Sequence, residues 1–333
     1  MIEVRKLTKN FGEKCAVDNL SFTVSEGVAY GFLGRNGAGK TTTIRILMNV
    51  FREDSGEALF NGVPAYKESV RIGYLPEERG LYAKRGVLEQ LIYFGMLKGM
   101  DRRRAESEGR AKLEEMEATE YTDKKLETLS KGNQQKIQLV CAMLGDPEVI
   151  ILDEPFSGLD PINAQVLKNA VRRQVDEGRT VIFSSHQMAQ VEEFCDDICI
   201  IDKGRSVLEG NLAEIKRAYP RDLIYIETEE RQGDGLSLLR AQPCVTEVTP
   251  KGRGFEVKLD DPAKRSMLLR ALEEADARVD SFYVVEPTLE QIFVEKAGAQ
   301  DPPDGKAEEG PEPPDKRGWR SKMFDKLKGR AAK

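Results

Sequence analysis

Short apolar runs separated by turn residues dominate the chain from Glu3 to about Gly210. Their lengths suit buried strands, and stretches with helical spacing of apolar positions lie between them. The clearest runs are VAYGFLG (28–34), IGYLP (72–76), VIILD (149–153) and TVIFSS (180–185). This alternation predicts an α/β fold with a largely parallel sheet. Between about 86 and 145, charged residues and helical periodicity predominate, which predicts a mostly helical insert.

The order of elements changes after Gly210. A strand (DLIYIET), a helix (LSLLRA), two strands (CVTEVTP and GFEVKLD), a helix (AKRSMLLRALEEA) and a strand (VDSFYVVE) follow one another. That succession predicts a small α+β, ferredoxin-like domain at 220–297, closed by the helix TLEQIFVEKA after Pro287. We therefore expect a first domain at 1–215 and this smaller accessory domain.

Residues 298–333 have a composition that is unlike that of a folded domain. Residues 298–315 are acidic and rich in proline, which predicts a disordered linker. Residues 316–333 carry eight Lys or Arg against one Asp, and Trp319, Met323 and Leu327 would share one helical face. Such a tail would lie on an anionic membrane surface, or it is a solvated basic end.

Charge and hydropathy exclude several classes of protein. The formal net charge of -6 and pI near 5.3 argue against a surface that binds nucleic acid as a whole. No apolar run approaches the roughly 20 residues of a membrane span, and the first residues lack a leader pattern, so we expect a cytoplasmic protein. We expect Cys195 and Cys199 to share a helix side and to pack in the core rather than bind metal.

The most specific motif is GRNGAGKT, which follows a strand pattern and opens a helix. It fits GxxxxGK[ST], in which backbone N–H groups and a helix N-terminus hold phosphate oxygens. Lys40 would bind the β and γ phosphates, and the Thr41 hydroxyl would bind Mg²⁺. The predicted nucleotide-binding residues here are Gly34, Arg35, Asn36, Gly37, Ala38, Gly39, Lys40, Thr41 and Thr42.

Two acidic residues end the buried strand VIILD. Asp153 is the predicted partner of the Mg²⁺ ion, and Glu154 would orient and deprotonate the attacking water. Together with the phosphate loop they predict an ATP-hydrolysing P-loop enzyme with ATP and Mg²⁺ at its site.

Three further segments indicate which family of P-loop enzymes this chain resembles. LSKGNQQK (129–136) places Ser130 and Gly132 at a helix start, SGLD follows Glu154 and contains Asp160, and His186 ends TVIFSSH. Their order and spacing resemble the ABC ATPase family over residues 2 to 215. GYLPEERGLY and LSKGNQQK are most similar to exporter ATPases of bacteria and archaea, of the sodium-efflux and drug-resistance types.

The resemblance implies further roles. Phe11 would stack on adenine with Val17 nearby, although a core aromatic is an alternative for Phe11. Glu77 stands where the family has glutamine and would touch Mg²⁺ or the attacking water. Lys131 and Asn133 also depart from the family's signature, which has Gly and Gln there.

The resemblance also implies an assembly. Two ATPase subunits, alike or different, would pack head to tail, so that Ser130 and Gly132 act on the partner's nucleotide while Lys40, Glu154 and His186 act on their own. Asp160 would lie at the dimer seam. Closure would drive a separate transmembrane permease at the inner face of the membrane, contacted through the segment after Glu77 that contains Leu81 and Tyr82. A soluble ABC ATPase acting on ribosomes or nucleic acid, and a ligand-regulated ATPase, are the alternatives.

Overall fold

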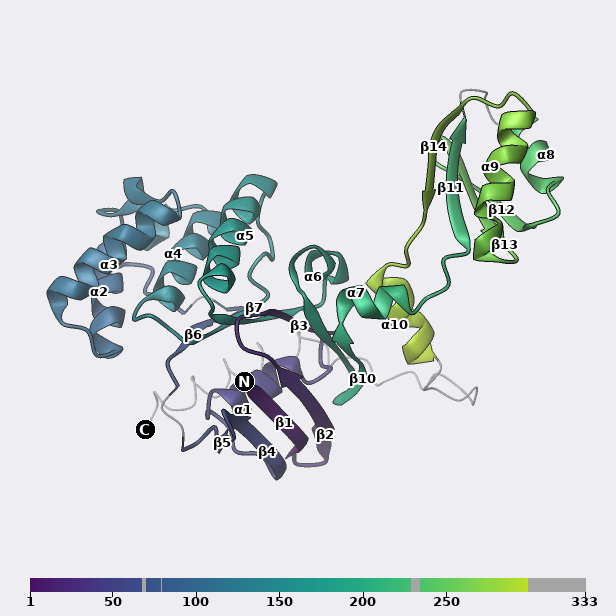
Figure 1. The fold of residues 1–333 in the computed structure, drawn as a ribbon. Coiled ribbons are helices and arrows are strands. Elements are labelled where there is room, and N and C mark those ends of the chain that lie inside the picture. Colours follow the sequence, from purple (N-terminus) through teal and green to yellow (C-terminus); the bar gives the residue numbers. More distant parts are fainter. Residues whose placement is uncertain (68–69, 79, 229–233, 299–333) are drawn as a thin grey trace, which may run out of the picture. The chain divides into compact units, whose positions relative to one another are not determined.

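A six-stranded sheet forms the centre of the first part of the chain. The computed structural model describes residues 1–67, 70–78, 80–228 and 234–298. The strand order is β10-β9-β3-β8-β7-β6, with five parallel strands and an antiparallel β10 at one edge (Figure 1). The strands are β3 (Ala29–Gly34), β6 (Ile72–Leu75), β7 (Val149–Asp153), β8 (Thr180–Ser185), β9 (Asp197–Asp202) and β10 (Arg205–Asn211).

The central strands are mostly apolar because both faces of this sheet are covered. In β7, Ile150 and Leu152 point into one core while Val149 and Ile151 point into the other. Side chains alternate between the faces of a strand, so an unbroken apolar run is what a doubly covered strand requires. The same alternation occurs in β3, β8 and β9.

One face of the sheet is covered by a second sheet and a helix. The second sheet is antiparallel, in the order β2-β1-β4-β5, and α1 lies between the two sheets with its buried side chains in the same core. These elements are β1 (Ile2–Phe11), β2 (Lys14–Val24), β4 (Ser55–Phe60), β5 (Val63–Pro64) and α1 (Lys40–Leu47). The α/β fold is confirmed, but the expectation of a single largely parallel sheet missed this antiparallel layer.

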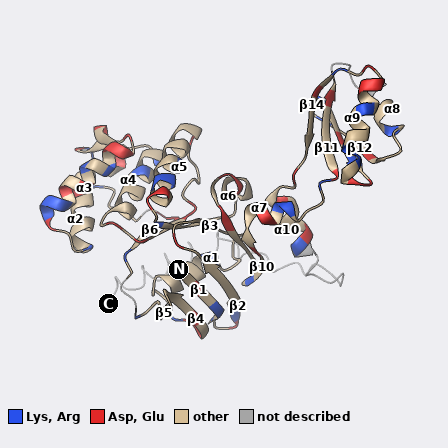
Figure 2. Ribbon diagram, viewed as in Figure 1, with Lys and Arg blue, Asp and Glu red and all other residues tan. Residues whose placement is uncertain are grey.

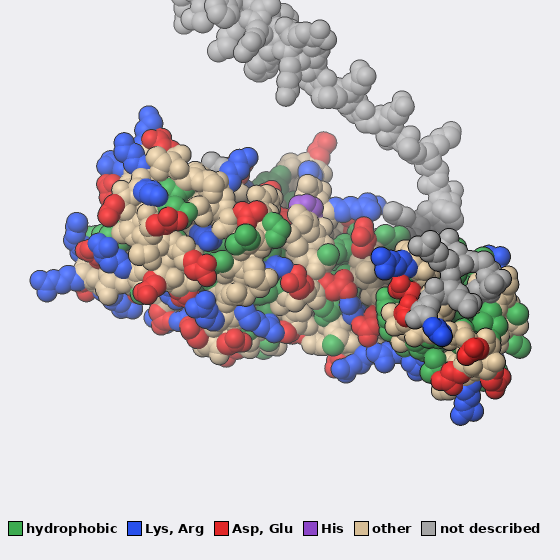
Figure 3. Space-filling view, turned by 90° about the horizontal axis from the view of Figure 1, so that it is seen from above, with side chains coloured by type: hydrophobic (Ala, Val, Ile, Leu, Met, Phe, Trp, Pro, Cys, Tyr) green, Lys and Arg blue, Asp and Glu red, His purple; other side chains and the backbone are tan. Residues whose placement is uncertain are grey.

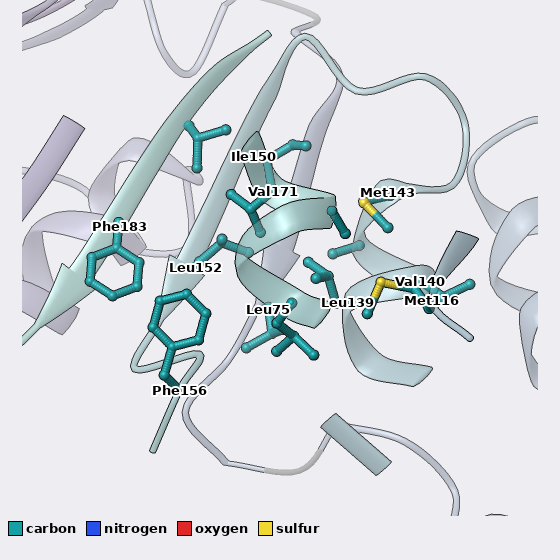
Figure 4. Close-up of a cluster of buried hydrophobic side chains, with 14 of the residues drawn as sticks. Leu75, Met116, Leu139, Val140, Met143, Ile150, Leu152, Phe156, Val171 and Phe183 are labelled. Atoms are coloured by element: carbon teal, nitrogen blue, oxygen red, sulfur yellow. The ribbon is translucent and has the colours of Figure 1, made fainter. Parts of the chain in front are cut away.

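Helices cover the opposite face. Leu139 and Val140 of α4, Val171 of α5 and Phe183 of β8 pack into one core, shown in Figure 4. Helices α2 and α3 lie beside α4 and enclose the rest of the helical insert (Figure 1). The helices are α2 (Val87–Leu97), α3 (Arg102–Glu115), η1 (Thr119–Tyr121), η2 (Leu126–Thr128), α4 (Lys131–Met143), α5 (Pro161–Asp176) and α6 (Met188–Phe194).

The outer surface of α3 is strongly charged, with both signs mixed. On α3, Arg104 pairs with Glu108 and Arg110 with Glu106, one helical turn apart. Figure 2 shows both Lys or Arg and Asp or Glu on the helices of the insert. Intrahelical pairs of this kind stabilise a solvated helix face without producing a surface of one sign.

A small sheet with two helices on one face follows. Its strand order, β12-β13-β11-β14, is fully antiparallel and is the ferredoxin-like order predicted from the sequence. Ile224, Ile226, Phe255, Leu268 and Leu272 contribute to its own core. The elements are β11 (Leu223–Thr228), α8 (Asp234–Arg240), β12 (Val245–Lys251), β13 (Gly254–Leu259), η3 (Pro262–Lys264), α9 (Arg265–Glu274) and β14 (Val279–Val284).

Two further helices flank this domain in the chain. Helix α7 (Leu212–Arg217) precedes it, and α10 (Leu289–Gly298) follows it and packs on α6 and β10. The predicted linker and basic tail, from residue 299 onward, lie outside the described residues. No helix in the described ranges combines the length and the apolar character needed to cross a membrane.

The prediction that Cys195 and Cys199 share a helix side was wrong. Cys195 ends α6, and Cys199 lies in the middle of β9, because the chain turns at Asp196 between a helix and a strand. Both thiols are buried, and burial raises the pKa of each. They belong to opposite cores of the large sheet.

Lys98 joins α2 to the end of α4. Its Nζ donates hydrogen bonds to the carbonyl oxygens of Cys141, Ala142 and Leu144, each at 2.9 Å. The last carbonyls of a helix have no partner within the helix, so the Lys98 ammonium satisfies three of them and complements the helix dipole. Burial lowers the pKa of Lys98.

We predict that Lys98→Met destabilises the fold by about 1–3 kcal/mol, because the charge-assisted hydrogen bonds to three carbonyls at the end of α4 are lost. Chemical denaturation monitored by circular dichroism measures the change. The exposed Lys84 provides the control, and Lys84→Met should change stability by less than about 0.5 kcal/mol. Equal effects of the two substitutions would contradict this role for Lys98.

Candidate nucleotide site

A cavity of about 330 Å³ opens at the carboxyl ends of the parallel strands. This is the edge at which open α/β sheets bind ligands. It is lined by Phe11, Lys14, Ala16, Arg35, Asn36, Gly37, Gly39, Lys40, Thr41, Thr42, Glu77, Asp153 and Glu154. The structure thus brings the phosphate loop, the acidic strand end, Phe11 and Glu77 together.

The loop between β3 and α1 requires glycine at its turn. Gly39 has φ of +106°, and a Cβ there would lie 2.5 Å from the carbonyl oxygen of Ala16. The amide of Ala38 donates to the carbonyl of Arg35 at 3.1 Å, which closes the turn. The loop therefore leads directly into the N-terminus of α1, where free N–H groups attract anions.

Lys40 is buried at the base of the loop. Its Nζ donates to the carbonyl oxygens of Gly34 at 2.6 Å and Arg35 at 3.3 Å. Burial lowers the pKa of Lys40, and the nearby carboxylates of Glu154, Asp153 and Glu77 oppose that shift. The Lys40 ammonium is poorly solvated and lies near three carboxylates. This combination suits a negatively charged ligand that carries its own metal cation, because the ammonium attracts the ligand and the carboxylates attract the cation.

Asp153 and Glu154 are held by serines of the neighbouring strand. Asp153 pairs in register with Ser184 across β7 and β8. Ser184 Oγ donates to Asp153 Oδ1 at 2.9 Å, and Ser185 Oγ donates to Glu154 Oε2 at 3.0 Å. Burial raises the pKa of Asp153, while the bond from Ser184 lowers it. The two serines thus fix two carboxylates that would otherwise repel each other.

His186 binds the same glutamate. Its backbone N–H and its ring Nδ1 lie 2.8 and 2.7 Å from Glu154 Oε1. The backbone of Glu154 has φ of +50°, an uncommon conformation for a residue with a side chain. His186, the one histidine of the sequence, reaches the surface, where Figure 3 shows it in purple.

The donors near Thr41 are hard oxygen atoms. Thr41 Oγ1 lies 3.5 Å from Asp153 Oδ2, and Glu77 lines the same cavity. Within the described residues no three His, Cys, Asp or Glu side chains form a cluster that could hold a metal by themselves. A hydroxyl with one carboxylate fits Mg²⁺, which usually retains water and phosphate oxygens among its ligands.

Phe11 and Val17 differ in their surroundings. Phe11 is partly exposed at the cavity, with its ring edge against Phe51 at a centroid distance of 5.5 Å. Val17 is fully buried in the core between the sheets, and its neighbour Ala16 lines the cavity instead. The cavity wall at this position is therefore formed by Ala16 and Lys14.

Ser130, Gly132 and Asp160 lie outside the cavity and close to one another. Ser130 caps α4 through the amide of Asn133, and Asp160 caps α5 through Asn163, whose side-chain amide also donates to Asp160 at 2.6 Å. A Cβ on Gly132 would lie 2.9 Å from the Asn163 Nδ2 atom. The starts of the two helices are thus in direct contact.

The sequence analysis missed Ser184 and Ser185 as site residues. The signal was present, because the two serines stand at the end of an apolar strand immediately before His186. Their function depends on β8 lying beside β7, which only the sheet order establishes. Gln135 was also missed, and its Nε2 donates to the carbonyl of Pro155 beyond the acidic pair.

Comparisons with known proteins agree with this geometry. A family described as "ABC transporter" matches residues 17–157, and "ATP-binding protein DrrA1-3-like, C-terminal domain" matches residues 210–297. The uncharacterised ABC transporter ATP-binding protein YhaQ of Bacillus subtilis (strain 168) is 42% identical over 300 residues, which cover 90% of this chain and 99% of that protein.

A named resistance protein and a solved structure extend the likeness. Daunorubicin resistance ATP-binding protein DrrA3 of Streptomyces coeruleorubidus is 30% identical over 89% of this chain and 96% of its own. An ATP-binding subunit of an ABC transporter superposes with a TM-score of 0.60 at 29% identity, over 65% of this chain and 92% of that one. The chain belongs to the ATP-binding subunits of ABC transporters, ATPases that use ATP and Mg²⁺.

Proposed function

We propose that this chain powers an exporter, by closing head to tail with a second ATPase subunit and thereby moving a separate transmembrane permease. The observation that carries the proposal is the separation of two sets of residues. Lys40, Asp153 and Glu154 line the cavity, whereas Ser130 and Asp160 lie outside it at exposed helix starts. Each chain would then supply a different half of each ATP site.

Within one chain, Lys40 would bind the phosphates and Thr41 with Asp153 would hold Mg²⁺, which neutralises charge on the β and γ phosphates. Glu154 would accept a proton from the attacking water. His186, 2.7 Å from Glu154, would orient that carboxylate and the water, and Glu77 would place a further charge beside them.

Glu154→Gln should retain ATP binding and reduce turnover roughly 100-fold or more, because an amide cannot accept the proton. Phosphate release and equilibrium nucleotide binding measure the two quantities. Glu148→Gln is the matched control, an exposed carboxylate at the opposite end of the same strand, and it should leave turnover unchanged. Normal turnover of Glu154→Gln would exclude Glu154 as the base.

The exposed starts of α4 and α5 suit a partner subunit. Ser130 and the N-terminus of α4 present free N–H groups to an anion, while the neighbouring Ile162 is 78% exposed. The Gly132–Asn163 contact would keep the two starts together as they close on the partner's ATP.

Ser130→Arg should abolish hydrolysis and leave ATP binding by the monomer intact, because its own cavity is unchanged. Lys40→Ala should abolish binding as well as hydrolysis. Mixing the two inactive variants of a homodimer should restore activity, since one composite site would contain an intact Lys40 and an intact Ser130. No recovery would point to a different partner subunit, and loss of ATP binding by Ser130→Arg would contradict the trans arrangement.

An aromatic cluster after Glu77 suits the permease. Tyr82, Tyr93 and Phe94 have ring centroids 5.4 to 6.3 Å apart, and Tyr82 and Tyr93 are 55% and 47% exposed. A hollow of about 320 Å³ lies beside them, lined by Tyr82, Arg85, Glu89, Gln90 and Tyr93. Exposed tyrosines around a hollow are typical of protein interfaces.

Gln90 orders this surface from beneath. It is buried, it accepts a hydrogen bond from the Tyr82 amide at 2.7 Å, and it donates to the carbonyls of Arg85 and Gly86. Leu81 packs against the core while Tyr82 points outward. The Gln90 side chain thus ties the backbone of Tyr82 to that of Arg85 and Gly86, and Tyr82 comes five residues after Glu77, which lines the ATP cavity.

The proposed direction of transport, export, rests on the similarity of this chain to a drug-resistance protein. The likeness to the daunorubicin resistance protein DrrA3 covers 89% of this chain, so it extends over both domains. The family model that matches residues 210–297 is also described as DrrA1-3-like. We propose an exported cargo on this basis, and a position at the inner face of the membrane through the permease.

Tyr82→Ala with Tyr93→Ala should leave the ATPase rate of the isolated subunit unchanged but release it from membranes. Fractionation of cells expressing tagged chains measures this, with a polytopic membrane protein expected to copurify with the wild type only. Met267→Ala, an exposed apolar residue of the small domain, is the control. Sedimentation of the wild type with ribosomes would support the soluble alternative instead.

A further inference from the structure

Helix α10, the last helix of the described residues, contacts the phosphate loop. The guanidinium carbon of Arg35 lies 5.4 Å from the centroid of the Phe293 ring. Arg35 is the second residue of the loop and lines the ATP cavity, whereas Phe293 is buried. A cation over an aromatic face at this distance is an attractive contact with a defined geometry.

We propose that Phe293 is a positioning residue for ATP binding, which acts by holding Arg35 and with it the phosphate loop. This assigns the segment that follows the small domain a role in the affinity of the subunit for ATP.

The first step of the argument is that α10 is fixed to the ATPase core. Leu289, Ile292 and Phe293 share one helical face and are buried, and Leu289 and Phe293 belong to the same core as α4 to α6. The amide of Leu289 donates to Glu192 of α6, and Glu192 also pairs with Lys216 of α7. The ring of Phe293 therefore has a fixed position relative to the core.

The second step is that the backbone of Arg35 supports the phosphate-binding lysine. The carbonyl of Arg35 accepts hydrogen bonds from the Ala38 amide and from Lys40 Nζ. Phe293 holds the side chain of the same residue. Displacement of Arg35 would therefore disturb the loop turn and Lys40 together.

The third step is the place of α10 in the chain. It begins five residues after β14 ends, so the chain returns from the small domain to the ATPase core over a short connection. Because α10 is fixed to the core, its contact with Arg35 places a segment that follows the small domain beside the ATP cavity.

Phe293→Leu is the main test, because leucine keeps an apolar side chain but removes the aromatic face. We expect the KM for ATP, and the Kd for a fluorescent ATP analogue, to rise about threefold to tenfold, while kcat changes less than about twofold. Phe293→Tyr keeps the ring face and should restore values near those of the wild type. Val294→Ala, on the exposed side of the same helix, is the control and should change neither constant.

The double substitution distinguishes a contact from general packing. In an Arg35→Ala background, Phe293→Leu should cause no further rise in KM, because the partner of the ring is already absent. Circular dichroism establishes that each variant is folded before binding is measured. The proposal is overturned if Phe293→Leu leaves KM and Kd unchanged, if Phe293→Leu and Phe293→Tyr shift them equally, or if the effect persists without Arg35.

Discussion

The pairing of β7 with β8 in register is the constraint on which the site depends. It places Asp153 opposite Ser184, and the next residue of each strand, Glu154 and Ser185, follows in the same relation. Two adjacent carboxylates at the end of a buried strand repel each other and are poorly solvated. The two serine hydroxyls and His186 compensate by giving each carboxylate a fixed hydrogen-bond partner. The phosphate loop on β3, the other neighbour of β8, then faces an acidic pair whose orientation is already set.

The parts of the site that the sequence predicted are those that local residues determine. The loop from Gly34 to Thr41 is contiguous, and its glycines, lysine and threonine have geometric functions that few other arrangements require. Asp153 and Glu154 could be found because an apolar run ends there. The helix and strand order of the small domain was likewise readable from alternation and periodicity, and its sheet order agrees.

The rest depends on neighbours that are distant in the chain. Ser184 and Ser185 become site residues only because β8 lies beside β7, and Ala16 rather than Val17 faces the cavity because of strand orientation. Cys195 and Cys199 are four residues apart, which would place them on one side of a continuous helix. Helix α6 ends at Cys195, so this spacing no longer applies. The contact of Arg35 with Phe293 joins opposite ends of the described chain and leaves no local pattern.

Lys98 gives α4 a property that its sequence alone does not suggest. One end of α4 carries Ser130, and the other is bound through three carbonyls to the residue that ends α2. A helix of 13 residues is a stiff rod of roughly 20 Å. The hydroxyl of Ser130 therefore lies one helix length, roughly 20 Å, from the end of α4 that Lys98 attaches to α2, so α4 forms a direct mechanical link between the aromatic residues of α2 and Ser130.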